Sequence, residues 1–237
     1  SFALIQCPFY FRRISASAEK NMKAIIVDKY GGPSVLTYGE LERPEPKPGE
    51  VLVKVYNVSV NVTLDIKLRQ GNYPIKPVFP HVMGIDPVGE IIQVGHGVAD
   101  SRVGERVGVH ALMRSDECIP GHEADDPKFY RFVGIHRSGG YADFVTVPSE
   151  NAFKIPINLS YPEATVIVRH LPTALHLLSS KGKLKKGEWV LVMGATGGLA
   201  SCCIQAAKKL GAIVIAGAGA DDRVDKAVNY FGADFGI

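Results

Sequence analysis

The stretch Glu188–Leu210 constrains the fold more than any other part of the chain, because it reads as a strand, a glycine-rich turn and a helix. Trp189–Met193 is an unbroken apolar run, typical of a strand buried on both faces. Gly194–Gly198 follows directly, and Leu199–Leu210 has the apolar spacing of a helix. A second apolar run, Ala212–Ala216, comes next. The pattern predicts a β-α-β unit with a glycine-rich first turn.

Such a turn suits a pyrophosphate. Small residues let backbone N–H groups approach it, and the dipole of the following helix favours the negative charge. The strict G-x-G-x-x-G spacing is absent, since Ala stands at the first and last positions of that frame. From this motif alone, the turn of another kind of α/β domain remains the alternative. The predicted cofactor contacts in the turn are Ala195, Thr196, Gly197, Gly198 and Leu199.

Composition excludes several classes of function. The chain has 237 residues, of which 46% are apolar and 22% charged, so it holds enough apolar material for one large or two ordinary globular domains. The net charge of +3 is too small to indicate nucleic acid or a membrane surface, and no apolar run is long enough to span a bilayer. The four cysteines lack C-x-x-C spacing, which favours a reducing compartment and hence the cytoplasm. The expected partner is a small-molecule substrate.

The chain divides into three predicted parts. Residues 1–21 form an N-terminal extension that contains basic but no acidic residues before position 19, so a remnant of a transit peptide to an organelle matrix is an alternative to a plain extension. Residues 22–157 carry short strands punctuated by glycine and proline, which predicts a partly open β-barrel or a sandwich. Residues 158–237 begin with a capping box, Ser160-x-x-Glu163, and Pro172 predicts a break into two short helices, the second beginning at Thr173.

The last residues look like a second helix followed by the start of a third strand. Asp221–Phe231 reads as a helix and Phe235–Ile237 as the beginning of a third strand. A dinucleotide-binding sheet has about six strands. The chain therefore reads as truncated within the second domain.

Taken in order, these motifs resemble the medium-chain dehydrogenase/reductase superfamily. The resemblance implies an α/β protein with a β-rich domain: a GroES-like partly open β-barrel followed by an incomplete Rossmann doubly wound parallel sheet. It covers roughly residues 22–237 and rests on these segments: Met22–Ile25, Pro46–Val55, Asp65–Pro74, Pro80–Gly89, Val103–Val107, Gly139–Phe144 and Gly194–Ala200.

Members of this superfamily fall into a zinc-dependent and a zinc-independent branch. At the positions of the three catalytic zinc ligands this chain has Val62 (or Asn61), Ile85 and Arg169, and a catalytic site needs three ligands from Cys, His, Asp and Glu. In the region of the structural zinc lobe, around residues 111–133, Cys118 is the single cysteine. The chain is therefore similar to the zinc-independent branch of quinone oxidoreductases and enoyl reductases, and we expect no zinc.

Without zinc, an isolated ketone lacks the Lewis acid that polarises it. A quinone or α,β-unsaturated carbonyl can accept hydride at carbon while hydrogen-bond donors stabilise a distant oxygen. The resemblance thus implies an NAD(P)H-dependent oxidoreductase acting on conjugated acceptors. The alternatives are an alcohol or aldehyde dehydrogenase-like enzyme, a cofactor-binding protein without catalysis, and an inactive fragment.

The resemblance also implies site residues. It puts Asn61 and Tyr73 in the substrate cleft, with Tyr73 as a proton or hydrogen-bond donor, and Thr173 at the nicotinamide. The plainer alternatives are that Asn61 is a loop residue, that the ring of Tyr73 packs beside Pro74, and that Thr173 is a residue at the start of a helix. Family members are commonly homodimers, so we expect one for a full-length protein.

The end of the second strand bears on the choice of cofactor. Ala218 and Gly219 leave room for a 2′-phosphate that Arg223 could pair with, whereas Asp221 and Asp222 lie where a carboxylate would bind the ribose of NAD. The strand end favours NADP(H) over NAD(H).

Overall fold

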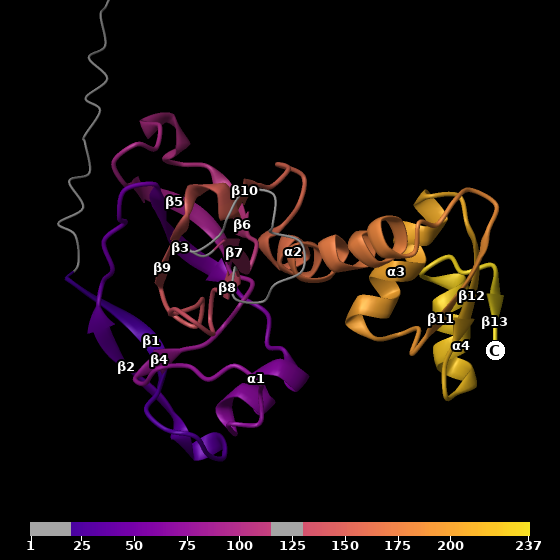
Figure 1. The fold of residues 1–237 in the computed structure, drawn as a ribbon, viewed down its shortest axis with the longest axis horizontal. Coiled ribbons are helices and arrows are strands. Elements are labelled where there is room, and N and C mark those ends of the chain that lie inside the picture. Colours follow the sequence, from indigo (N-terminus) through magenta and orange to yellow (C-terminus); the bar gives the residue numbers. More distant parts are fainter. Residues whose placement is uncertain (1–19, 115–129) are drawn as a thin grey trace, which may run out of the picture.

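The computed structural model describes residues 20–114 and 130–237, which form a β-rich body and a small α/β body joined by the long helix α2 (Figure 1). The strands are β1 Asn21–Val27, β2 Leu36–Glu42, β3 Glu50–Asn57, β4 His81–Val82, β5 Val88–Val94, β6 Arg106–Val109, β7 Leu112–Arg114, β8 Tyr130–Phe132, β9 Phe144–Pro148, β10 Ala152–Lys154, β11 Trp189–Met193, β12 Ile213–Gly217 and β13 Phe235–Gly236. The α-helices are α1 Val62–Arg69, α2 Tyr161–Leu175, α3 Gly198–Lys209 and α4 Asp221–Asn229. Among these described elements, none is a helix with the length and apolar character that crossing a membrane requires.

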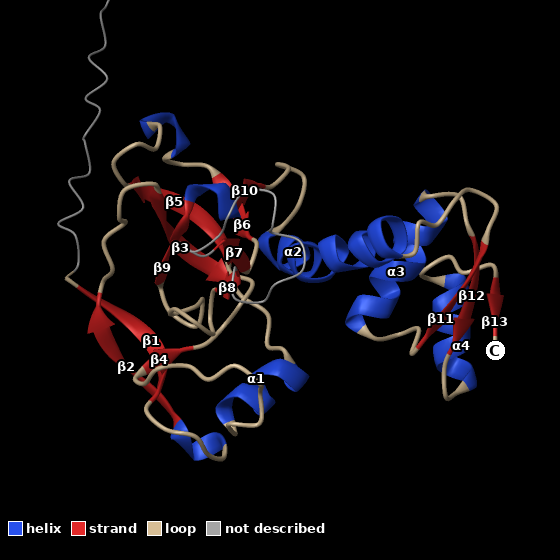
Figure 2. Cartoon of the chain, viewed as in Figure 1, coloured by secondary structure: helices blue, strands red, loops and turns tan. Residues whose placement is uncertain are grey.

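The β-rich body is built from two main antiparallel sheets, seen as red arrows in Figure 2. A five-stranded sheet has the order β10-β6-β5-β3-β9, and a three-stranded sheet has the order β2-β1-β4. Inward-facing valines and isoleucines of the larger sheet, such as Val53, Ile91 and Val107, are fully buried in one core. An isolated bridge joins Ala24 of β1 to Ala142, which lies in the segment just before β9. The described strands form open sheets and not a closed barrel. This agrees with the predicted partly open barrel.

The α/β body confirms the predicted β-α-β unit. Strands β11, β12 and β13 are parallel neighbours in that order, and α3 and α4 form the connections between them. Both helices cover one face of this sheet, where Val192, Val214 and Ala216 are buried. The close approach of α4 requires glycine at position 236, because a Cβ there would lie 2.2 Å from Val224 Cγ1.

The prediction that the first strand of this unit is buried on both faces is wrong for this chain. The side chains of Trp189, Leu191 and Met193 are 60%, 53% and 66% exposed. Strand side chains alternate between faces, and α3 and α4 both cover the other face, so no described element covers this one. Trp189 instead stacks on Phe235 of β13, with ring centroids 5.5 Å apart.

The predicted break at Pro172 is also wrong. The capping box forms as expected, with Ser160 and Glu163 bonded reciprocally, but α2 then runs through Pro172 to Leu175 and continues as a π-helical turn, His176–Lys181. A proline inside a helix removes one backbone hydrogen bond. Burial of Ala174 and Leu178 in the core of the α/β body offsets that loss and keeps the helix continuous.

Helix α2 packs on both bodies. Near its start, Ala164 and Val168 lie against Val88 and Ile155 of the β-rich body. At Gly108 of β6 the approach is close, because a Cβ there would lie 2.3 Å from Val168 Cγ2. This contact sets how the next residue of α2, Arg169, meets the β-rich body.

Gly108→Ala should therefore lower the free energy of unfolding by about 1–3 kcal/mol, because the added methyl overpacks against a β-branched side chain. In the Gly108→Ala/Val168→Ala double variant the loss should be smaller than the sum of the two single losses. Urea denaturation followed by circular dichroism measures all three. The control is Gly32→Ala, where a Cβ meets no atom within 4 Å; equal effects at positions 32 and 108 would contradict the close contact.

Candidate functional site

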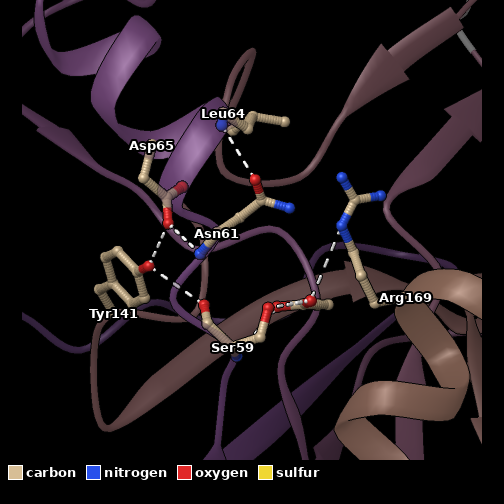
Figure 3. A network of polar contacts seen from close by, with 7 residues as sticks. Ser59, Asn61, Leu64, Asp65, Tyr141 and Arg169 are labelled. Carbon is tan, nitrogen blue, oxygen red and sulfur yellow. Dashed lines mark hydrogen bonds and ion pairs between the residues drawn. The ribbon is translucent and has the colours of Figure 1, made fainter. Parts of the chain in front are cut away.

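A network of polar side chains lies where α1, the loop before it and α2 meet (Figure 3). Asn61 is the N-cap of α1: its Oδ1 accepts a hydrogen bond from the backbone N–H of Leu64 at 2.9 Å. The carboxylate of Asp65, one turn into the helix, accepts from the backbone N–H of Asn61 at 2.7 Å. The hydroxyl of Tyr141 donates to the same carboxylate. Asn61 is thus a helix cap, and its side-chain orientation is held by α1.

Asp86 is the second buried carboxylate of the network. It is 1% exposed and accepts hydrogen bonds from the backbone N–H of Ser59, at 3.1 Å, and from the Ser59 hydroxyl. The guanidinium of Arg169 approaches from α2, with Nε 3.9 Å from Asp86 Oδ2. One carboxylate therefore ties the loop before α1 to the middle of α2.

Burial changes the protonation of these groups. Loss of water raises the pKa of Asp65 and of Asp86, and the hydrogen bonds that each carboxylate accepts oppose the rise only in part. Burial, together with the Asp65 carboxylate, also raises the pKa of Tyr141, so that its hydroxyl stays protonated and remains a donor.

Arg169 is poorly satisfied as a hydrogen-bond donor. Its Nε is buried without a hydrogen-bond acceptor, because 3.9 Å is too long for a hydrogen bond. Its terminal nitrogens, Nη1 and Nη2, also donate to no residue that the structure describes. The side chain is 26% exposed, so these nitrogens lie at the edge of solvent.

The residues at the expected catalytic zinc positions do not fit zinc. Val62 is exposed, Ile85 is buried and apolar, and Arg169 brings a fixed positive charge next to Asp86. Within residues 20–114 and 130–237 no group of three His, Cys, Asp or Glu side chains could hold a metal ion. Cys118, expected in the structural zinc lobe, lies outside the described residues.

The glycine turn fits the pyrophosphate of a dinucleotide. Gly194 has φ +65, a conformation that glycine adopts freely, and Gly197 is the N-cap of α3 without a side-chain cap. The first-turn amides of α3, including those of Gly198 and Leu199, therefore have no capping partner from a side chain and suit an anion. Ala195 is buried and donates its N–H to the Gly217 carbonyl at 3.1 Å, whereas Thr196 is half-buried.

Helix α2 also reaches this turn. A Cβ at Gly198 would lie 2.6 Å from Nε2 of His170, the residue after Arg169. Burial, with a contribution from the Arg169 charge, lowers the pKa of His170. The polar network and the glycine turn are thus connected through two adjacent residues of one helix.

The remaining predicted residues fall in two places. Ala218, Gly219 and Arg223 follow β12 as predicted; Gly219 meets no atom within 4 Å of a built Cβ, and α4 begins nearby without a side-chain cap. Thr173 lies exposed on α2, one turn after Arg169. Tyr73 packs against a core cluster that includes Leu68 and Ile85, and no described contact joins it to the network.

An apolar cleft of about 480 Å³ lies between α2 and β10 and contains none of the network residues. Apart from His110 and Lys154, the described residues that line it carry no ionisable side chain. We therefore place the candidate site at the network and the glycine turn.

The network itself was missed as a unit in the sequence. Of its members that are not at the helix cap, only Arg169 was singled out in the sequence, as a residue at a zinc-ligand position. Ser59, Asp65, Asp86 and Tyr141 carried no predicted role. The available signal was a pair of aspartates in two motif segments, Asp65 and Asp86, with a cation, Arg169, at the third zinc-ligand position.

Comparison with known proteins relates the chain to oxidoreductases. Residues 47–157 match the alcohol dehydrogenase GroES-like domain. The chain is 36% identical to an alcohol dehydrogenase of Geobacillus stearothermophilus over 90% of its own length and 62% of that protein, and 30% identical to a quinone oxidoreductase of Sus scrofa over 87% and 56%. A solved NAD-dependent alcohol dehydrogenase matches with a TM-score of 0.84 and 36% identity, over 91% of this chain and 63% of that one. The chain thus spans about three fifths of the length of these relatives.

The buried carboxylate predicts a pH effect on stability. Because burial raises the native pKa of Asp86 above its ordinary value, the native state binds more protons than the unfolded state between those two pKa values. The free energy of unfolding should therefore fall as pH rises through that window. In Asp86→Asn this contribution is absent, so the wild type should lose stability relative to the variant as the pH rises above the ordinary pKa of an aspartate.

Urea denaturation at several pH values measures this difference. Exposed Asp28 offers the matched control, Asp28→Asn. Parallel stability curves for the wild type and Asp86→Asn would contradict the assigned burial effect.

Proposed function

We propose that this chain, which belongs to the medium-chain dehydrogenase/reductase superfamily, is part of an oxidoreductase that transfers hydride from NADPH to a conjugated carbonyl or a quinone without zinc. Relatives of this chain include alcohol dehydrogenases and quinone oxidoreductases, which supports the class of reaction. The cofactor preference, the substrate class and the absence of zinc are our inferences from the site.

One observation carries the proposal: the fixed cation of Arg169 stands beside buried Asp86, at a position where zinc-dependent members have a metal ligand. A guanidinium cannot ligate zinc, and its charge opposes a second cation nearby. The site must then stabilise negative charge through hydrogen bonds and the arginine charge.

The cofactor would be held by residues of the α/β body. The uncapped first turn of α3 suits the pyrophosphate, and Gly219 with Arg223 suits a 2′-phosphate. Thr173 lies on the same face of α2 as Arg169, one turn further along. Bound NADPH would supply the hydride; this chain's residues would orient it and set the charge around the acceptor.

The alcohol dehydrogenase-like alternative has one observation in its favour. Identity to the Geobacillus stearothermophilus alcohol dehydrogenase, at 36%, exceeds that to the Sus scrofa quinone oxidoreductase, at 30%. That difference reports descent more than chemistry, because the site residues differ from those that zinc requires. Assays of both reaction types therefore have to be run together.

For the cofactor, we expect the chain to bind NADPH more tightly than NADH. Arg223→Ala should weaken NADPH binding about tenfold, which is about 1.4 kcal/mol, and leave NADH binding unchanged, because only NADPH carries the 2′-phosphate. Energy transfer from Trp189, the single tryptophan of the chain, provides the measurement. Exposed Lys29 in the β-rich body supplies the control, Lys29→Ala. Tighter binding of NADH, weakened by Asp222→Ala, would reverse the assignment.

For the reaction, we expect oxidation of NADPH by quinones and enones, unaffected by metal chelators, and no oxidation of simple alcohols. Absorbance of the reduced cofactor follows both reactions. Comparable turnover of simple alcohols would support the dehydrogenase alternative. Cofactor binding without any turnover would support a non-catalytic role or an inactive fragment.

A further inference from the structure

The guanidinium of Arg169 has hydrogen-bonding capacity that the described protein does not use. An arginine has five N–H donors, and the Asp86 oxygen nearest to Nε is 3.9 Å away. The Asp86 carboxylate is already bonded by the backbone N–H and the hydroxyl of Ser59. Buried Nε has no hydrogen-bond acceptor among the residues that the structure describes. A partly buried cation with open donors calls for an acceptor from outside the chain.

Asn61 provides a second open donor. Its Oδ1 is used by the Leu64 backbone N–H, which leaves the amide nitrogen, Nδ2, as the outward group. In Figure 3 this nitrogen points toward the side on which the Arg169 guanidinium lies. Asn61 follows Ser59 by two residues, and Ser59 bonds to the carboxylate that faces Arg169, so the two donors belong to one connected unit.

Both donors are held in place. The N-cap bond of Asn61 and the bond from its backbone N–H to Asp65 fix one side. The packing of Val168 against Gly108 and the contact of His170 with Gly198 fix the turn of α2 that carries Arg169. Donors that need no rearrangement are the ones that stabilise a developing charge best.

We propose that Arg169, with the amide of Asn61, forms an oxyanion site that binds the carbonyl oxygen of the substrate. This inference rests on the proposed function and makes it specific: Arg169 is a catalytic residue, and Asp86 is a positioning residue that acts through it. The site takes acceptors in which the oxygen is conjugated to the carbon that receives hydride.

The electron balance is simple. A hydride delivered from the nicotinamide cofactor forms a C–H bond at the β-carbon of the acceptor. The π electrons of the C=C bond shift toward the carbonyl, and its oxygen becomes an enolate oxyanion. Arg169 and Asn61 stabilise that oxygen by charge and hydrogen bonds. Protonation of the α-carbon by water would then restore the C=O bond, give the saturated carbonyl compound and leave hydroxide in the solvent.

The first experiment needs no turnover. The chromophoric probe 4-nitrophenol resembles an enolate when it binds as the phenolate, so an oxyanion site should lower the apparent pKa of the bound probe. In Arg169→Ala the affinity for the phenolate should fall about tenfold or more, and Arg169→Lys should retain part of it, because the charge remains but the planar fork is lost. Free guanidinium ion added to Arg169→Ala should restore phenolate binding.

Two further variants guard against a folding defect. Arg169→Ala/Asp86→Asn removes the carboxylate that Arg169→Ala would leave without its cation. Val166→Ala changes an exposed residue of the same helix and should leave phenolate affinity unchanged. In every variant NADPH affinity is measured separately by energy transfer from Trp189.

The outcomes separate the two proposals. Loss of phenolate binding and of turnover in the Arg169 variants, with unchanged NADPH affinity and rescue by guanidinium, supports the oxyanion site. Equal phenolate affinity in the wild type and Arg169→Ala overturns it, and so does a parallel loss of phenolate and NADPH binding without rescue, which would indicate a structural role. A wild type that binds phenolate but neither NADPH nor NADH would instead contradict the proposed function.

Discussion

The buried carboxylate of Asp86 determines the geometry of the candidate site. At 1% exposure, an ionised carboxylate has lost its water and must be offset by hydrogen bonds or an opposite charge. Ser59 supplies two hydrogen bonds and thereby fixes the loop that leads to Asn61 and to α1. Arg169 supplies the charge and thereby fixes how α2 meets the β-rich body. Three segments far apart in the sequence converge because one side chain has to be compensated.

Helix α2 extends that constraint to the α/β body. Adjacent residues of a helix point about 100° apart, so Arg169 can face Asp86 while His170 lies against Gly198 of the glycine turn. A helix broken at Pro172 would allow the two bodies to move relative to each other at that point. The continuous helix, held by Ala174 and Leu178 in the core beyond the proline, keeps the polar network and the glycine turn in a fixed relation.

The sequence predicted those structural features that depend on residues close together in the chain. The β-α-β unit and the cap of α2 follow from local spacing, and both are confirmed. The continuity of α2 through Pro172 could not be predicted in this way, because distant packing offsets the lost hydrogen bond. The exposure of one face of β11 could not be predicted either, because an apolar run does not show whether other elements cover one face of the strand or both. The network was missed for the same reason: Ser59, Asp86 and Tyr141 are unremarkable locally and meet only in the folded chain.

The difference between a metal and an arginine also decides which acceptors suit this site. Zinc accepts a lone pair from oxygen and polarises an isolated carbonyl directly, whereas a guanidinium offers only charge and hydrogen bonds. Its contribution is greatest when negative charge already moves onto oxygen through conjugation. An arginine also keeps its proton in proteins, so in the proposed reaction Arg169 stabilises the oxyanion but does not protonate it. The proton must come from water or from a side chain near the acceptor. Tyr73, predicted for that role, packs against the core cluster that contains Ile85, and no described contact joins it to the network. In the proposed reaction the proton therefore comes from water, which can reach the partly exposed side chain of Arg169.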